Sequence, residues 1–305
     1  MKIRQSVFLG SLLCLAGAMP LADAASEAET KPLPLAQAIA RARELAAREL
    51  PEHLRAIDAR KTAGDFDAND FFKAYRRLRM DDGYTLDYVY RYEFAGGEPV
   101  LFARKKDEKA PETHAEFLAW ALLRRLNDEK AHAQYAGMAE KAAKAESEID
   151  RHAALEALRS AAAQAAPAAG DPEEEWIEHV RCDGTPEGWQ ELGALYVTAK
   201  QFYLFWHAAY NDRMLIASRE ALEQAIERIG EGAAPFPPES AGKARALNCD
   251  ATVETKDGKT TVSFLTFTNW GGFQRLTLTF ASEFPHKLLD SEIEPLVEYD
   301  CGILF

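Results

Sequence analysis

Hydrophobic residues recur at helical spacing in the first part of the chain. Leu35, Ile39, Ala42 and Leu45 lie three or four positions apart, which is the spacing of one face of an α-helix. This part of the sequence predicts three helices: one from Leu35 to Ala46, one that begins at Pro51, and one over about 68–79.

After residue 85 the pattern changes to a period of two, which is typical of a strand. In LDYVYRYEF the apolar positions fall on one face, at Leu86, Tyr88, Tyr90, Tyr92 and Phe94. A glycine-containing turn and a second apolar run follow, so we predict a β-hairpin. We expect its aromatic face to pack on the helix that comes next; the alternative is a stacking platform for a sugar or a peptide.

Residues 112–166 are rich in alanine, glutamate, lysine and arginine and contain no proline. This composition predicts one long helix or a helical pair, broken near Gly137. The sequence AAPAAGDPEEE follows at 165–175, where proline, glycine and a charge run indicate a domain boundary. We interpret Glu173, Glu174 and Glu175 as the solvated edge of this linker.

The second half of the chain is predicted to be richer in strands. The segment 202–210, FYLFWHAAY, is apolar on both faces and indicates a central strand. A strand at 214–217 precedes a helix that Ser218 caps and Gly230 ends. Three further strands are expected near 249–255, 260–268 and 274–281.

These elements predict an α+β protein. Its N-terminal part is helical with one β-hairpin, and its C-terminal part is built on an antiparallel sheet with a flanking helix. The predicted segments are a signal peptide at 1–24, a disordered leader at 25–34, a mainly helical domain at 35–166, a linker at 167–175 and an acidic α+β domain at 176–305.

The N-terminus has the pattern of a secretory signal. A short basic region precedes an apolar run from Val7 to Met19, which is too short to span a bilayer. We expect cleavage after Ala24 and a soluble periplasmic or secreted product without a membrane span. Lipid attachment at Cys14 is the alternative.

The negative charge of the chain is concentrated in its second half. The net charge is −13, and residues 171–305 hold 23 acidic side chains against 11 basic ones. Such a surface repels nucleic acid and attracts a cationic protein. Solubility alone is the alternative reason for the charge.

Three cysteines follow the predicted cleavage site: Cys182, Cys249 and Cys301. An oxidising compartment allows one disulfide among them. We favour Cys249–Cys301, because both lie near predicted strands, and such a bond is worth about 4 kcal/mol on the chain-entropy model. Pairings through Cys182 stay open.

The sequence DFDAND, residues 65–70, has the alternating carboxylates of a calcium loop. Such a loop needs glycine at its sixth position and glutamate at its twelfth, where this chain has Asp70 and Arg76. We therefore interpret the segment as a helix start that Asp67 caps, and expect no metal or other cofactor. His179 and Cys182 lack the second pair that a zinc site requires.

Two further groups of residues are candidates for a site. Cys182 could act as a nucleophile with His207 as its base, although a histidine in an apolar strand is more often a core residue. The turn at Trp270, Gly271, Gly272 and Phe273 could expose two aromatic side chains to a partner. The alternative for this turn is packing against its own domain.

No nucleophile elbow, P-loop or dinucleotide fingerprint occurs in the sequence. We therefore expect a binding protein rather than an enzyme. The predicted function is that of an exported inhibitor or immunity-type protein whose acidic half engages a cationic protein. The alternative is a secreted hydrolase whose carboxylate and histidine residues come from separate parts of the chain.

Overall fold

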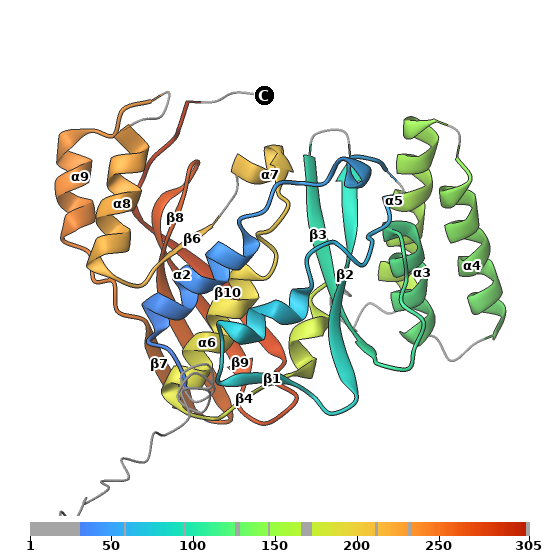
Figure 1. The fold of residues 1–305 in the computed structure, drawn as a ribbon, viewed down its shortest axis with the longest axis horizontal. Helices are drawn as coiled ribbons and strands as arrows, with labels where there is room; N and C mark the ends of the chain where they lie inside the picture. The colour runs from blue at the N-terminus through green and yellow to red at the C-terminus, as the bar shows by residue number, and fades with distance from the viewer. Residues whose placement is uncertain are drawn as a thin grey trace, which may run out of the picture. The chain divides into compact units, whose positions relative to one another are not determined.

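The computed structural model describes residues 31–57, 59–93, 96–125, 129–145, 147–165, 173–210, 213–230 and 234–302. The predicted signal peptide and its cleavage site lie outside these residues, as do most of the predicted leader and linker. From Leu33 onward the described residues form one compact unit. The predicted α+β fold class is confirmed, with helices packed on antiparallel sheets (Figure 1).

The first predicted helix is confirmed as α2 (Leu35–Ala46), which buries its apolar stripe in the main core. The other two are 3₁₀ turns, at Glu52–Leu54 and Ala68–Lys73, and the short strand β1 (Leu78–Met80) follows. Asp67 begins the second of these turns as predicted, because its carboxylate accepts a hydrogen bond from the N–H of Asn69.

Strands β2 (Tyr84–Glu93) and β3 (Gly96–Lys105) form the predicted hairpin. Tyr88 and Tyr90 lie fully inside the main core, and the Tyr88 ring meets Phe202 at 4.8 Å. The opposite face of the hairpin, with Val89 and Phe102, belongs to a second cluster that includes the next helix. The expectation for the aromatic face was therefore wrong, because the face toward the helix is the opposite one. The hairpin is buried on both faces.

Three helices cover that second face: α3 (His114–Arg125), α4 (Glu129–Ala143) and α5 (Glu148–Ala165). They lie together beside the hairpin in Figure 1. The predicted break at Gly137 is wrong, since this glycine lies in the middle of α4. An isolated glycine lowers helix propensity by only about 1 kcal/mol, which packing overrides.

The next elements connect the hairpin to the C-terminal sheet. A 3₁₀ turn at Glu175–His179 leads into β4 (Val180–Cys182), which pairs with β1, and then into α6 (Pro186–Thr198). The predicted strand at 202–210 is wrong. Within this segment the strand is limited to β5 (Phe205–Trp206), and α7 (His207–Tyr210) is helical. The chain turns at Tyr203 and Trp206, whose positive φ values of 54° and 50° prevent one continuous strand.

The C-terminal sheet is antiparallel and has five strands: β6 (Met214–Ile216), β7 (Thr252–Lys256), β8 (Lys259–Thr268), β9 (Gly272–Ala281) and β10 (Leu288–Val297). Its order is β10-β9-β8-β6, and β7 pairs with another part of β8. The sequence predicted every strand of this sheet except β10.

Helices cover much of the sheet. One face packs on α6, where Gly193 allows close approach: a Cβ there would lie 2.7 Å from the Phe264 ring. Part of the other face packs on α8 (Arg219–Gly230) and α9 (Pro238–Arg245). Ser218 caps α8 as predicted, accepting a hydrogen bond from the N–H of Ala221 at 3.1 Å. No described helix is long and apolar enough to cross a membrane.

The expected disulfide between Cys249 and Cys301 is not formed. Both residues are buried in the cluster beneath α8 and α9, yet both are free thiols, as is Cys182. Shared burial does not bring two sulfur atoms to bonding distance, which requires a specific orientation of both Cβ atoms. Both cysteines therefore act as small apolar side chains in this core.

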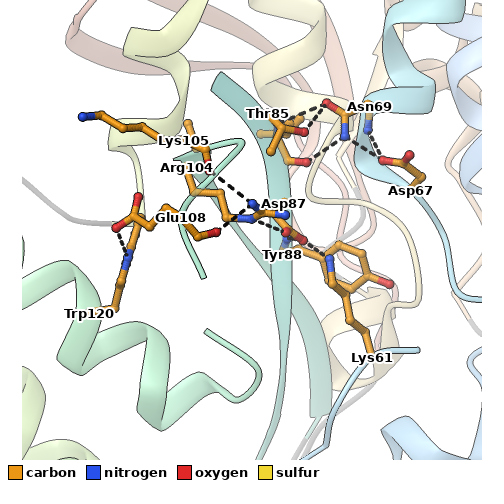
Figure 2. A network of polar contacts seen from close by, with 12 residues as sticks. Lys61, Asp67, Asn69, Thr85, Asp87, Tyr88, Arg104, Lys105, Glu108 and Trp120 are labelled. Carbon is orange, nitrogen blue, oxygen red and sulfur yellow. Dashed lines mark hydrogen bonds and ion pairs between the residues drawn. The ribbon is translucent and has the colours of Figure 1, made fainter. Parts of the chain in front are cut away.

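Side chains occupy the outer edge of β2 (Figure 2). The Asn69 amide accepts a hydrogen bond from the N–H of Leu86 and donates one to its carbonyl, as a neighbouring strand would. Asp87 is 5% exposed, and its carboxylate pairs with Lys61 and accepts a hydrogen bond from Arg104 Nε at 2.8 Å. Burial, followed by the nearby Arg104 charge, lowers the pKa of Lys61 to about 8.

Another buried carboxylate, Glu191, lies on α6 and is 1% exposed. Its Oε2 accepts a hydrogen bond from the N–H of Arg77 at 2.8 Å, and its Oε1 lies 3.7 Å from Arg77 Nε. The Arg77 guanidinium also donates to Asp183 at 3.1 Å. Burial raises the pKa of Glu191 to about 7, although the contacts with Arg77 oppose this shift.

We expect Asp87→Asn to lower the free energy of unfolding by about 3 kcal/mol, because it leaves two cations without their shared carboxylate. Urea denaturation measures this change. Asp82→Asn is the control: its side chain is 97% exposed and its ion-pair partner among the described residues is the exposed Arg79, so the change should stay within about 0.5 kcal/mol. Equal effects of the two substitutions would contradict the role of Asp87.

Glu191 should make the protein less stable as pH rises. Its pKa is raised from 4.5 to about 7, so between these values the folded chain binds a proton that the unfolded chain releases. We expect Glu191→Gln to be more stable than the wild type at pH 8, by about 1 to 3 kcal/mol, and nearly equal to it at pH 4.5. Unfolding curves across this range test the prediction, with the exposed Glu187→Gln on the same helix as control. A difference that does not vary with pH would count against it.

Candidate functional site

The strand β10 lies at the edge of the C-terminal sheet. All residues from Leu289 to Pro295 are exposed. Its register with β9 is interrupted between Leu288 and Asp290 and again between Pro295 and Val297. The central part of the strand is therefore regular and open to solvent.

Three carboxylates, from Asp290, Glu292 and Glu294, lie on one face of β10, because alternate residues of a strand share a face. No described residue forms an ion pair with any of them. The chain from 288 to 301 also contains Glu298 and Asp300, and it has no lysine or arginine. The edge of the sheet is thus strongly negative.

The main chain of β10 has fewer free donors than acceptors. The N–H of Ser291 donates to the Asp290 carboxylate at 2.9 Å, and Pro295 has no N–H. An edge strand normally offers both donors and acceptors to a neighbour. Here the carbonyls and carboxylates predominate, which suits a ligand that carries hydrogen-bond donors and positive charge.

Beside Asp290 and Glu292, the face that bears the three carboxylates continues across the sheet as a set of hydroxyl groups, whereas Glu294 lies opposite Arg275. Thr279 lies beside Thr261, and Thr277 beside Ser263, with oxygen atoms 3.3 Å and 3.0 Å apart. These four side chains are half-buried. The negative strand therefore borders a flat polar surface rather than an apolar one.

The turn that was a candidate partner site, Trp270 to Phe273, packs against its own sheet. Phe273 is fully buried and Trp270 lies half-buried against the same cluster. Gly272 has a φ of +70°, and a Cβ there would lie 2.1 Å from the carbonyl oxygen of Val297. Phe273 offers no surface to a partner, and the burial fits the packing alternative.

Cys182 contacts His286, at 3.6 Å between Sγ and Nε2, rather than His207. The His286 Nδ1 lies 3.3 Å from the carbonyl oxygen of Ala281. Burial raises the pKa of the Cys182 thiol and lowers the pKa of the His286 imidazole. Both groups are therefore held neutral, whereas a cysteine nucleophile needs its thiolate form.

The glutamates at 173–175 are not a solvated edge, and that interpretation was wrong. All three are half-buried. Glu173 accepts hydrogen bonds from Arg91 at 3.0 Å and 3.1 Å, and Glu174 pairs with Lys200. Burial alone would raise the pKa of Glu173, but His114 and Arg91 hold it at about 2.

No cluster of three or more histidine, cysteine or acidic side chains in the described ranges is arranged to hold a metal ion. Asp65, at the start of the calcium-like segment, instead accepts hydrogen bonds from His53 and from the N–H of Thr62. Its carboxylate thus orders a loop.

Sequence reasoning missed β10, and with it Asp290, Glu292 and Glu294. Pro295 and the two irregular pairings obscure the period of two in this segment. The signal that could have identified it is the run of alternating acids without a base.

Comparisons with protein-family models, with curated proteins and with solved structures found no match to this chain.

Proposed function

We propose that this protein binds an extended, cationic segment of another protein along β10. The observation that carries the proposal is the exposed row of Asp290, Glu292 and Glu294, none of which has an ion-pair partner among the described residues. In this proposal the protein is exported, and acts as an inhibitor or immunity-type protein by covering a basic surface of its partner.

The spacing of the carboxylates defines the pattern they would bind. Side chains two residues apart on a strand are separated by about 7 Å on the same face. A partner segment that is also extended, with lysine or arginine at every second position, has the same spacing. Its ammonium or guanidinium groups could contact the carboxylates and the free carbonyls of β10.

The expected energies are modest. An exposed ion pair contributes about 0.5 kcal/mol, so three pairs give roughly a tenfold gain in affinity. Long-range attraction also speeds association, and salt weakens it because the Debye length falls to about 8 Å at physiological ionic strength. A cysteine nucleophile at Cys182 has less support, since burial raises the pKa of its thiol. The hydrolase built from carboxylate and histidine residues stays the alternative function.

A pair of synthetic peptides tests the proposal. One has lysine at alternate positions among threonines, and the other has the same composition with its lysines contiguous. We expect the alternating peptide to bind more tightly, and high salt to weaken its binding. Replacing Asp290, Glu292 and Glu294 together with Asn, Gln and Gln should reduce its affinity about tenfold, as measured by fluorescence anisotropy.

The control removes the same charge elsewhere: Glu227→Gln on α8, Glu254→Gln on β7 and Glu283→Gln in the loop before β10. These three residues are exposed as well, and their replacement should leave peptide affinity within about twofold. Equal losses in the two triple variants would show only a general effect of net charge. A third result is that the β10 variant keeps its peptide affinity and begins to self-associate. That result would show that the three carboxylates only prevent the β10 strands of two molecules from pairing.

A further inference from the structure

A pocket of about 620 Å³ lies on the opposite side of β10 from the acidic row. Its walls come from the end of the β2–β3 hairpin, α5, the end of α6, α7, and the strands β9 and β10. Ser291 and Ile293 of β10 line it, and these two residues alternate with the three carboxylates. A volume of this size is typical of a site for a small organic molecule.

Arg213 lines this pocket, and only one nitrogen of its guanidinium group, Nη1, donates hydrogen bonds to described residues. Its Nη1 donates to the Gln274 side chain at 2.7 Å and to the Thr266 hydroxyl at 3.2 Å. Both partners are neutral. Thr266 on β8 and Gln274 on β9 together hold the Arg213 side chain in place. The Nε and Nη2 atoms bond to no described residue, yet they are not buried. They form the side of the guanidinium that binds a carboxylate through two parallel hydrogen bonds.

The charge of Arg213 also lacks a counterion. No described carboxylate forms an ion pair with it, and its burial lowers its pKa. The other two cations of the pocket are compensated: Arg91 pairs with Glu98 and Glu173, and Lys200 pairs with Glu174. A half-buried cation without a counterion favours a ligand with one negative charge.

Apolar side chains line one part of the pocket, while Glu98, Gln201 and other polar residues line the rest. Leu276, Leu204 and Ala208 face it, and Ile293, which is 46% exposed, forms part of its rim. His207 also lines the pocket, so it is not a core histidine of a strand. These walls suit a short hydrocarbon body attached to the charged group.

We infer that the pocket binds a small organic acid. Its carboxylate would accept hydrogen bonds from Nε and Nη2 of Arg213, and its apolar body would lie against Leu276 and Ile293. This inference is independent of the cationic partner proposed for β10, because it rests on the opposite face of that strand and on charge of the opposite sign.

Octanoate is a suitable probe, with octan-1-ol as the uncharged molecule of the same chain length and inorganic phosphate as an anion without a hydrocarbon. We expect calorimetric titration of the whole exported protein to show octanoate binding at least about tenfold tighter than either. Equal affinity for octan-1-ol would show that the pocket is an apolar cavity that does not recognise the carboxylate. Tighter binding of phosphate, or no binding of octanoate, would also overturn the inference.

Arg213→Gln should weaken octanoate binding by about tenfold or more, because a hydrogen-bonded charge is lost. Arg275→Gln is the matched control, since Arg275 follows Gln274 on β9 and lies on the acidic face of the sheet. It should change the affinity by less than about twofold. Equal effects of the two replacements would contradict the assignment of Arg213.

A second pair of variants tests the pocket while keeping Arg213, so its result holds even if Arg213→Gln fails to fold. Leu289 and Ile293 are both on β10 and both 46% exposed, but only Ile293 lines the pocket. Ile293→Asp places a negative charge at the rim and should weaken octanoate binding about tenfold, whereas Leu289→Asp should not. The same loss in both variants would show that octanoate binds elsewhere on the strand.

Discussion

The fold depends on a hairpin that is buried on both faces. Tyr88 and Tyr90 of β2 fill the main core, while Val89 on the other face packs against the helices α3 to α5. A strand pair in this position cannot present a polar face to water, so its few charged groups must be paired. Asp87 is such a group, and its two cationic partners make its burial tolerable.

The position of the hairpin also explains why the segment after α6 is not a strand of the large sheet. Phe202 packs under Tyr88, and β5 then pairs with Gly96 and Gly97 of the hairpin. A Cβ at Gly96 would lie 3.0 Å from the carbonyl oxygen of Phe205 and 3.1 Å from the backbone nitrogen of Ala208, so glycine at this position allows the approach. The chain bends at positive φ to reach the hairpin, which no local pattern in an apolar run reveals.

The sequence was sufficient for elements whose periodicity is local. The hairpin, α2, the cap at Ser218 and the strands β7 to β9 each follow from spacing or from a turn residue within a few positions. Elements shaped by distant contacts were missed: β10 through its proline and irregular register, and α7 through its contact with the hairpin. Arg213 could not be identified either, because its role depends on Thr266 and Gln274, which follow it by more than fifty residues.

The two proposed sites require the same register of β10. Side chains on a strand alternate between its faces, so a slip of one residue would turn Asp290 and Glu292 toward the pocket and Ile293 toward the acidic row. Irregular pairings at both ends of the strand work against such a slip. Gly272 contributes as well, since only a residue without a Cβ lets the carbonyl of Val297 approach so closely. Gly272 lies in the turn whose aromatic side chains were the candidate for partner binding, and it helps instead to fix the strand that carries the two proposed sites.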